Sequence, residues 1–485
     1  MDESVPLLPT VARKWPYIVC LPVFFHCLVY LSYVGVQSQW LLVYLCGHQD
    51  ATSKFFPGLF YKTPSLPNPE FEYCRQIPEV QALASQWSMI LHVTMGIPAL
   101  LAVPLYGILS DRFGRKPVLL SSMFASCIVI SGYLSVTILD FGLWVLILVN
   151  FISGCLGSYY IMVGAVLSYV SDLTLPTERA QAFLIVEATY FAGFACGPIL
   201  GGFLARHFPN GPQDVFLLAF SLDLVIITLV ILLLPESFKN RPDSNSESIV
   251  QNVKSSIRNV TSVFKAYMSK AFALLLLASC TAPIPTVTHS LFFYYVSYRF
   301  GWDSQDEGVY LLVSSITRMA CMVLVYPVLT RLFSSFIAGG KKTTLDLNLL
   351  RMALFLAAVA PVLQGLVPNG IDLFFITPIQ AFGSLAMPTL RSLLSKTIPS
   401  DSQGALFSGL SFIEQIFGVV FNLTLPMVWK STVKTQPNAF LFVIGFIYLF
   451  GSGTVWFTAP EDLDEVDIEC EVTSDGSVPH LEIEN

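Results

Sequence analysis

Residues 107–117 read GILSDRFGRKP, a short stretch with four charged side chains between two long apolar segments. The flanking segments, 86–109 and 117–138, each contain the roughly 20 apolar residues that a helix needs to cross a bilayer. Gly114 permits a tight turn, and Gly107 would let two helices approach closely. The stretch therefore predicts two antiparallel membrane helices joined by a positively charged turn.

The same alternation of long apolar segments and short polar loops continues along the chain. Of its 485 residues, 54% are hydrophobic and 12% are charged, whereas about a quarter of a soluble domain is charged. The ten-residue alternating pattern of a membrane β-barrel does not occur. We therefore predict an all-α polytopic membrane protein with twelve transmembrane helices. The predicted spans are 16–38, 86–109, 117–138, 143–170, 183–204, 214–234, 271–298, 307–332, 345–366, 371–394, 404–428 and 436–458.

The twelve segments divide into two six-helix halves, 16–234 and 271–458, around a linker at 235–270. The linker opens with polar residues and continues with an apolar stripe of helical spacing. This stripe predicts an amphipathic helix on the membrane surface, with a plain polar linker as the alternative. LPTERAQAF (175–183) and IPSDSQGALF (398–407) form a faint repeat between the halves, and duplicated halves are typical of transporters with a central binding site.

Lysine and arginine are concentrated in the loops on the side of the 107–117 turn, which predicts that both termini are cytosolic. The N-terminal tail (1–15) and an acidic tail (459–485) are then cytosolic, and the long loop 39–85 is outside. Cys46 and Cys74 share this outer loop, so we predict a disulfide, with two unpaired thiols as the alternative. An acidic dileucine motif in the N-terminal tail leaves the plasma membrane or a vacuolar or endosomal membrane as the expected location.

Two glutamates, Glu187 and Glu414, stand inside predicted spans. Ionisable groups are costly there and usually have a function. A carboxyl group kept out of water can retain its proton near neutral pH, so we predict that both carry protons. The alternative for each is a fixed ion pair or a hydrogen bond between helices. Asp223 lies near the outer end of its span and is expected to reach the interface.

Three basic side chains in the second half are candidate substrate contacts. Arg318 would hold an anionic group of the substrate or neutralise one of the glutamates. Arg391 would serve in binding or as a structural latch, and His289 would contact substrate or relay protons. His26 and His92 are expected to be packing histidines. A buried arginine in a cavity suggests an organic anion as the solute.

The apolar span that contains Glu187 ends in GFACGPILGG (193–202). Gly193, Gly197 and Gly201 recur every four residues, so they line one strip of a helix against which another helix can pack closely. Pro198 and Gly202 lie beside that strip. Glu187 is rotated away from it, so the carboxylate can face a cavity.

The 107–117 turn resembles the signature loop of the major facilitator superfamily, and the resemblance covers nearly all of residues 15–460. The residues that carry it are Gly107, Asp111, Arg112, Gly114, Arg115 and Lys116. The resemblance implies the major facilitator fold and an inner latch that stabilises the outward-open state. The glycine strip resembles a signature of facilitator antiporters, which favours export.

SDLTLPTERAQAFLIVEA (171–188) is similar to the helix 4–5 region of the proton-coupled folate transporter family. This similarity implies a role in proton coupling for Glu187 and for Asp172, fifteen residues before it. The helix 10–11 region also resembles that family, with Arg391 at its functional arginine. The chain differs at Ile284, where the family has a histidine. Other stretches look like fungal facilitators.

These observations predict a secondary active transporter that moves a small organic solute by alternating access, coupled to protons. Export by antiport is the first expectation. The alternatives are a symporter that imports an organic anion, and a non-transporting sensor or scaffold on the same fold. Because the sequence contains no P-loop, metal-ligand cluster or nucleophile arrangement, we expect no enzymatic activity, cofactor or metal. The expected partners are a small-molecule substrate, protons and the lipid bilayer but no nucleic acid, with the monomer as the functional unit.

Overall fold

The computed structural model describes residues 16–47, 71–174, 179–237, 264–265, 267–326, 328, 342–397 and 403–459. Both tails, the dileucine motif and most of the linker with its predicted amphipathic helix lie outside these residues. The side chains of Asp111 and Glu187 also lie outside the description, although both residues belong to described helices.

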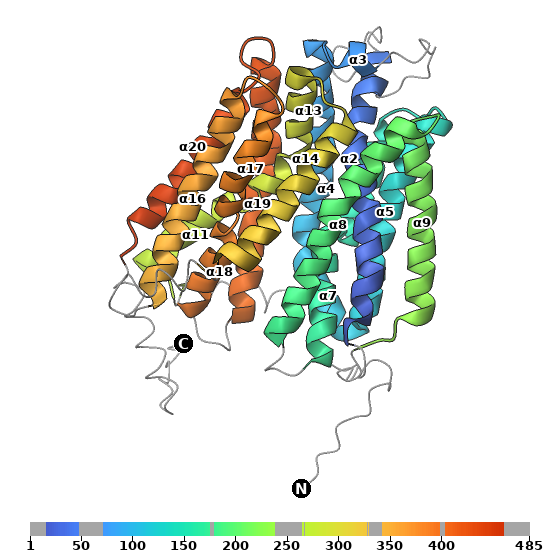
Figure 1. The fold of residues 1–485 in the computed structure, drawn as a ribbon. Helices are drawn as coiled ribbons and strands as arrows, with labels where there is room; N and C mark the ends of the chain where they lie inside the picture. Colours follow the sequence, from blue (N-terminus) through green and yellow to red (C-terminus); the bar gives the residue numbers. More distant parts are fainter. Residues whose placement is uncertain are drawn as a thin grey trace, which may run out of the picture. The chain divides into compact units, whose positions relative to one another are not determined.

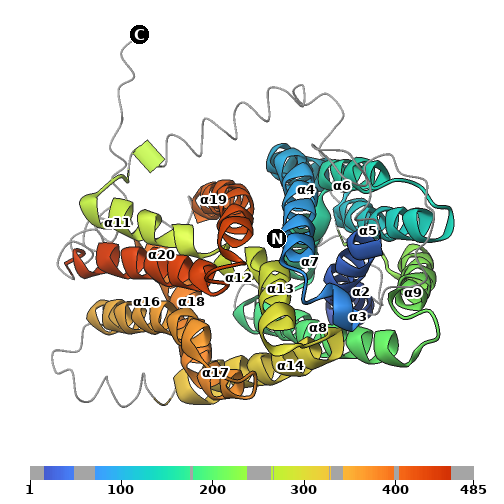
Figure 2. The same cartoon turned by 90° about the horizontal axis from the view of Figure 1, so that it is seen from above.

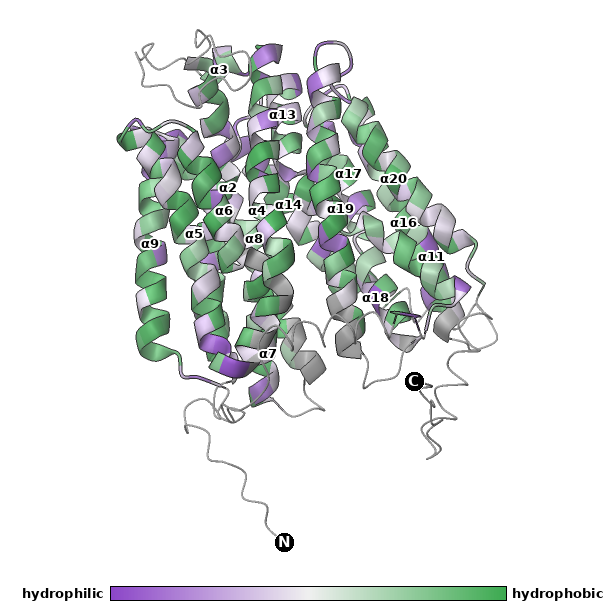
Figure 3. Ribbon diagram, turned by 180° about the vertical axis from the view of Figure 1, so that it is seen from behind, coloured by the Kyte–Doolittle hydropathy of each residue, from purple (hydrophilic) through white to green (hydrophobic). Residues whose placement is uncertain are grey.

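The described residues form helices joined by short turns, with no strand among them. Eleven helices in this part of the chain are long and apolar enough to cross a membrane. The 36-residue helix α4 (Pro78–Phe113) corresponds to the remaining predicted span. Hydrophobic residues cover most of the helix surfaces, as along α9 (Figure 3). The prediction of an all-α, multi-pass membrane protein is therefore confirmed.

The helices group into two compact units, each described here on its own. Unit 1 contains residues 1–253, 285–316 and 418–440. In it α2 packs against α8 and α9, and α13 lies beside α4 (Figures 1 and 2). Besides α4, the elements of unit 1 are η1 (Pro16–Val19), α2 (Cys20–Gly47), α3 (Phe71–Cys74), α5 (Arg115–Ile138), α6 (Trp144–Leu156), α7 (Ser158–Leu173), α8 (Arg179–His207), α9 (Pro212–Leu233), α13 (His289–Phe300), the start of α14 (Ser304–Ala320) and the end of α19 (Gln403–Thr432).

Unit 2 contains residues 254–284, 317–417 and 441–485. Its core is made of buried aliphatic side chains around Phe272, including Leu350, Leu390 and Leu406. Its elements are α11 (Lys270–Ala278), η2 (Ser279–Thr281), the π-helical turn η3 (Cys321–Val325), α16 (Lys342–Leu366), α17 (Asp372–Gly383), α18 (Ala386–Lys396), the start of α19 and α20 (Ala439–Trp456). The short helix α12 (Ile284–Val287) stands at the boundary between the two ranges.

Parts of the second predicted half thus belong to unit 1, namely α13, the first turns of α14 and the last turns of α19. They do so because α13 packs against α4 of the first half, and the end of α19 packs in turn against α13. The Tyr294 hydroxyl lies 2.7 Å from Ser88 Oγ, and Trp429 and Phe440 pack edge-on against Tyr295 of α13. We call the end of unit 1 that carries Cys46 the disulfide end, and the opposite end the Gly114 end.

Several predicted boundaries differ from the structure. The outer loop predicted at 39–85 is shorter, because α2 continues to Gly47 and α4 begins at Pro78. The span predicted at 143–170 is two helices, because Gly157 adopts a left-handed backbone with φ of +105° between α6 and α7. The span predicted at 271–298 is broken between α11 and α13, in a stretch with two prolines.

Candidate functional site

The turn at Gly114 is held by a carboxylate from a distant part of unit 1. Gly114 has φ of +106° and separates α4 from α5, which begins at Arg115. The Glu236 carboxylate accepts hydrogen bonds from the backbone N–H groups of Arg115 (2.8 Å) and Lys116 (3.2 Å). It thus neutralises the positive N-terminus of α5. The positive φ favours glycine here, and a Cβ at position 114 would lie 2.5 Å from Glu236 Oε2, so that any other side chain would displace this carboxylate.

Arg115 connects this turn to the end of α7. Its Nε lies 3.0 Å from Asp172 Oδ2, and its Nη1 donates to Ser110 Oγ at 2.9 Å. The Ser237 hydroxyl donates to the same Asp172 oxygen at 3.1 Å. Asp172, predicted to act in proton coupling, is therefore a salt-bridge partner of the turn in this structure. Its part in proton coupling stays a prediction.

The other signature residues differ in their surroundings. Lys116 Nζ donates to a backbone carbonyl of α9 at 2.8 Å, and Arg112 is half-buried. Gly107 is exposed, and a Cβ there would meet no atom within 4 Å. Within the described residues of unit 1, the close helix approach expected at Gly107 is not seen. Asp111 belongs to α4, and its side chain lies outside the description.

The glycine strip of α8 packs against α2. A Cβ at Gly197 would lie 2.6 Å from Leu31 Cβ, and one at Gly201 would overlap the carbonyl oxygen of Ser32. Gly193 makes the same kind of contact one turn earlier. The four-residue spacing thus marks a helix-packing strip, as the sequence predicts, and the partner helix is α2.

Gly202 faces a different neighbour, the first turns of α14, whereas Pro198 lies between the two neighbours, with its Cβ 3.3 Å from where a Cβ on Gly35 of α2 would stand. A Cβ at Gly202 would lie 2.5 Å from Gln305 Cα. In return, a Cβ at Gly308 would lie 2.8 Å from the carbonyl oxygen of Pro198. The two helices therefore pack backbone against backbone near the disulfide end, and this contact leaves no room for a side chain between them.

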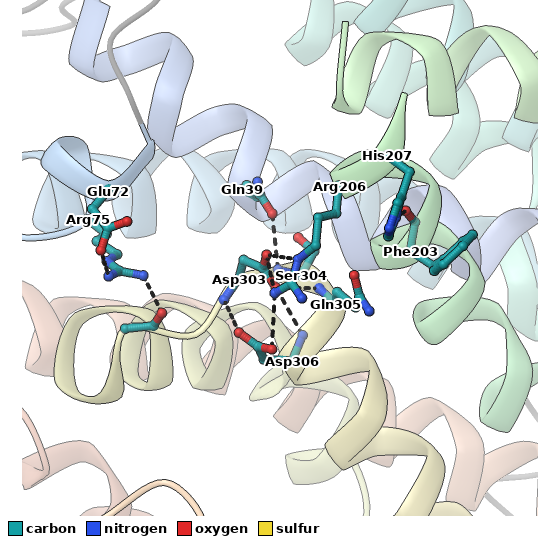
Figure 4. A network of polar contacts seen from close by, with 11 residues as sticks. Gln39, Glu72, Arg75, Phe203, Arg206, His207, Asp303, Ser304, Gln305 and Asp306 are labelled. Atoms are coloured by element: carbon teal, nitrogen blue, oxygen red, sulfur yellow. Dashed lines mark hydrogen bonds and ion pairs between the residues drawn. The ribbon is translucent and has the colours of Figure 1, made fainter. Parts of the chain in front are cut away.

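Charged residues tie the same helix ends together (Figure 4). Arg206, at the end of α8, lies 2.6 Å from Asp303 Oδ2 and 3.1 Å from Asp306 Oδ1. Gln39 of α2 accepts a hydrogen bond from the backbone N–H of Ser304 at 3.0 Å. Sequence reasoning did not single out these residues. The only local signal was opposite charge at the ends of two predicted spans.

The predicted cysteine pair is bonded in the structure, and it joins α3 to the end of α2. The Cα atoms of Cys46 and Cys74 lie 5.7 Å apart. The neighbouring Arg75 forms an ion pair with Glu72 and donates a hydrogen bond to the carbonyl of Gly301, just beyond α13 (Figure 4). The disulfide end is thus held by both a covalent bond and polar contacts.

The candidate His289 is the first residue of α13. Its Nδ1 is buried and has no hydrogen-bond partner among the described residues. His92 is within electrostatic range, and its own Nδ1 lies 2.8 Å from the carbonyl oxygen of Ser88. His92 is thus a packing histidine, as expected, whereas the predicted role of His289 in binding stays a prediction.

Asp223 does not reach an interface, contrary to our expectation. It is 1% exposed, and its Oδ1 lies 2.6 Å from His26 Nδ1. The Ser126 hydroxyl donates to the other oxygen at 2.5 Å. The helix rotation that turns Asp223 inward gives it these partners in α2 and α5, and it makes His26 the packing histidine that we expected.

In unit 2 the structure brings together two of the predicted site residues. Arg391 of α18 donates through Nη2 to both carboxylate oxygens of Glu414 in α19, at 2.9 and 3.3 Å. The Glu414 side chain is 15% exposed and that of Arg391 is 49% exposed. Arg318, in α14, lies instead within electrostatic range of the Tyr448 hydroxyl. Arg391 therefore neutralises Glu414, and the role predicted for Arg318 stays a prediction.

The model of the Major Facilitator Superfamily matches residues 78–422. The chain belongs to the major facilitator superfamily. Among the relatives of this superfamily member is the MFS-type transporter avaJ of Aspergillus versicolor, 27% identical over 412 residues that cover 79% of this chain and 78% of the relative. The class B tetracycline resistance protein of Escherichia coli is 29% identical over 372 residues, which cover 73% of this chain and 84% of the relative.

Solved structures of other transporters share the fold of this superfamily member. The human organic anion transporter MFSD10 (TETRAN) matches 92% of this chain and its own full length, with a TM-score of 0.59 and 16% identity. A D-xylose-proton symporter matches 92% of this chain and 99% of its own, with a TM-score of 0.58 and 15% identity. The protein is thus a multi-pass membrane transporter of the superfamily and not an enzyme.

Proposed function

We propose that this protein is a proton-coupled secondary transporter that exports a small organic solute in exchange for protons. The observation that carries the proposal is the ion pair between Arg391 and Glu414 inside a membrane helix bundle. Glu414 follows Gln403, the first residue of α19, by eleven residues, which is about 16 Å along the helix. Charges at such a depth are retained for a function, because their burial is costly.

The ion pair allows the proton, the solute and Arg391 to compete for the Glu414 carboxylate, and this competition can couple the movement of the solute to that of protons. When Glu414 is ionised, its carboxylate is occupied by Arg391. A proton, a donor group of a solute or the arginine can each occupy this carboxylate, but not all at once. If a cationic or donor-bearing solute takes the place of Arg391, then protonation of Glu414 displaces the solute. Binding of the proton and of the solute then exclude each other, which is the requirement for antiport.

Export is supported by the glycine strip of α8, which resembles that of facilitator antiporters, and by the tetracycline resistance protein among the relatives. A membrane transporter confers resistance by moving a drug out of the cell. Glu187 lies in α8 as well, and we propose it as a second proton carrier.

A second candidate, a symporter that imports an organic anion, follows from the same ion pair. An anionic group that binds Arg391 would remove the counter-ion of Glu414 and thereby raise its affinity for a proton. Proton and anion would then bind together. The charge of the solute therefore decides between the two directions of coupling.

The test is proton movement in sealed proteoliposomes that contain a pH-sensitive dye, with an imposed pH gradient. Cationic, zwitterionic and anionic solutes, tetracycline among them, are added to the wild type and to Glu414→Gln, Arg391→Gln and Glu187→Gln. Glu79→Gln is the control, because this glutamate is exposed at the disulfide end.

We expect a solute in this panel to move protons in the wild type and the control, and to lose this coupling in Glu414→Gln. Protons that move opposite to the solute indicate antiport, and protons that accompany it indicate symport. Full coupling in Glu414→Gln would remove this residue as the carrier. Full coupling in Glu187→Gln as well would overturn the proton-carrier assignment.

A further inference from the structure

Another buried carboxylate, Glu307 of α14, stands in unit 1 and takes no part in the proposed function. It is 1% exposed, and its Oε1 is buried with no hydrogen-bond partner among the described residues. It lies in the second predicted half, yet it packs among helices of the first. A carboxylate that is ionised in such a place is strongly destabilised, because it has lost water and gained no donor.

The N-terminus of α14 would normally offer donors to this carboxylate, but these are occupied. Asp303 accepts hydrogen bonds from the backbone N–H groups of Gln305 (2.9 Å) and Asp306 (3.0 Å). Gln39 accepts the hydrogen bond from Ser304. The donors that stabilise an anion at a helix N-terminus are thus used by Asp303 and Gln39.

The nearest titratable group on the neighbouring helix α13 is also occupied. The Tyr294 hydroxyl lies within electrostatic range of Glu307, but it shares its hydrogen bonds with the hydroxyls of Ser88 and Ser38. Arg206 of α8, the cation at this end of α14, is paired with Asp303 and Asp306. Titratable and charged side chains on the elements around Glu307 include His289, Tyr294, Tyr295, Tyr298 and Arg299 on α13, His92 on α4, Arg206 and His207 on α8, and Asp303, Asp306 and Tyr310 on α14 itself.

Backbone packing keeps water from the carboxyl group. The residue after it, Gly308, packs so closely against α8 that a Cβ would lie 2.6 Å from Ile199 Cα. On the other side, the ring of Tyr310 stacks on Phe292 of α13 at a centroid distance of 5.3 Å. If the first turns of α14 separated from α8 and α13, water would reach the carboxyl group and allow it to ionise.

We propose that Glu307 is a proton-binding site that holds its proton while α14 is packed against α8 and α13, and releases it when these helices separate. The proton is therefore a ligand of the packed state of the disulfide end. This inference does not rest on the proposed exchange at Glu414. A superfamily member that carries no protons with its solute could still have this site.

The sign of the effect follows from linkage. The packed state holds one proton more than the separated state, so a rise in pH favours separation. Over the pH range in which only the packed state holds the proton, the separation equilibrium changes by roughly tenfold per pH unit. Glu307→Gln keeps the shape of the neutral acid and has no proton to lose, so its separation should not depend on pH.

The experiment is hydrogen–deuterium exchange of the full-length protein in nanodiscs at pH 5.5, 7 and 8.5, corrected for intrinsic exchange rates and followed on peptides from residues 304–316. Glu79→Gln is the matched control. A hydrogen bond from Lys434 lowers the pKa of Glu79, so this exposed carboxylate stays ionised throughout that range. We expect exchange of these peptides to rise with pH in the wild type and in the control, and to stay low and constant in Glu307→Gln.

A pH-independent wild type, or a Glu307→Gln variant with the wild-type pH dependence, would overturn the proposal. If the variant does not fold, infrared spectroscopy of the protein in a background that carries both Glu187→Gln and Glu414→Gln decides. A C=O band of a neutral carboxyl group that persists at neutral pH and shifts in deuterated water supports the proposal, and its absence overturns it. The exchange and infrared results do not depend on whether Glu414 couples protons to transport. The proposal for Glu307 can therefore be wrong while the proposed function is right, and the reverse.

Discussion

Gly201 of α8 lies directly against the backbone of Ser32 in α2, where a Cβ would overlap the serine carbonyl oxygen. We therefore expect Gly201→Ala to lower the free energy of unfolding by about 1–3 kcal/mol through overpacking, although alanine favours a helix. Thermal unfolding in detergent measures this loss. The control is Gly453→Ala in α20, where a Cβ would meet no atom of the described residues within 4 Å. Equal melting temperatures for the two variants would contradict the close contact of α8 with α2.

The carboxylate of Glu236 caps α5, so its removal should destabilise unit 1 near the Gly114 end. We expect Glu236→Ala to cost about 1 kcal/mol, the typical value for a lost N-cap. Gly114→Ala should cost more, because the residue has a positive φ and its Cβ would approach Glu236. Glu79→Ala, which removes an exposed carboxylate, should change the melting temperature little. If the melting temperature of Glu236→Ala equalled that of the wild type, the cap would add no stability.

The ion pair of Arg206 with Asp303 holds the ends of α8 and α14 together. Because both side chains are partly exposed, we expect a coupling energy of roughly 0.2–1 kcal/mol in a double-mutant cycle with Arg206→Gln and Asp303→Asn. The coupling should fall in high salt, since salt screens exposed charges. Arg299→Gln, an exposed arginine at the end of α13, is the control. A coupling of zero at low salt would show that the Arg206–Asp303 pair does not help to join these helices.

Arg351 of α16 closes the C-terminus of α20. Its Nη2 donates to the carbonyl of Thr458 at 2.7 Å and its Nε to that of Val455 at 3.3 Å, while the guanidinium stacks over the Trp456 ring. We expect Arg351→Met to cost about 1.5–3 kcal/mol, the usual contribution of a charged hydrogen bond. Arg351→Lys should recover part of it, since a lysine cannot hold two carbonyls in a planar fork.

The melting temperature of each Arg351 variant is compared with that of Arg299→Met, in which an exposed arginine is replaced. Proteolysis of unit 2 near residue 456 gives an independent reading, because an uncapped helix end frays. If Arg351→Met and Arg299→Met had the same melting temperature, the hydrogen bonds of Arg351 to the end of α20 would not stabilise the protein.

The predicted disulfide and the predicted glycine strip are both present, and each had a local signal in the sequence. Cys46 and Cys74 were the cysteines of one outer loop, and Gly193, Gly197 and Gly201 share one side of a helix by spacing alone. Gly157, by contrast, sits inside an unbroken apolar run, where nothing in the hydropathy indicates that the helix stops.

The residues that the sequence did not single out are those whose partners lie far along the chain. Glu307 stood at the first position of a predicted span and was not singled out, because its burial depends on α8 and α13 packing around it. Asp172 was linked to Glu187 by spacing, whereas its salt-bridge partner is Arg115, which lies 57 positions away.

The sequence by itself determined that this protein is a bundle of membrane helices, because the length and apolarity of each segment decide locally whether it can cross a bilayer. It also determined the turn at Gly114 and the packing strip of α8, since both depend on spacing within one element. Only the tertiary structure decided that Glu236 caps α5, that Arg391 pairs with Glu414 and that Glu307 Oε1 is buried with no hydrogen-bond partner in the described part of the chain. Those contacts depend on how each helix is rotated and tilted against neighbours that are distant in the chain, and the pattern of one segment contains no information about that rotation.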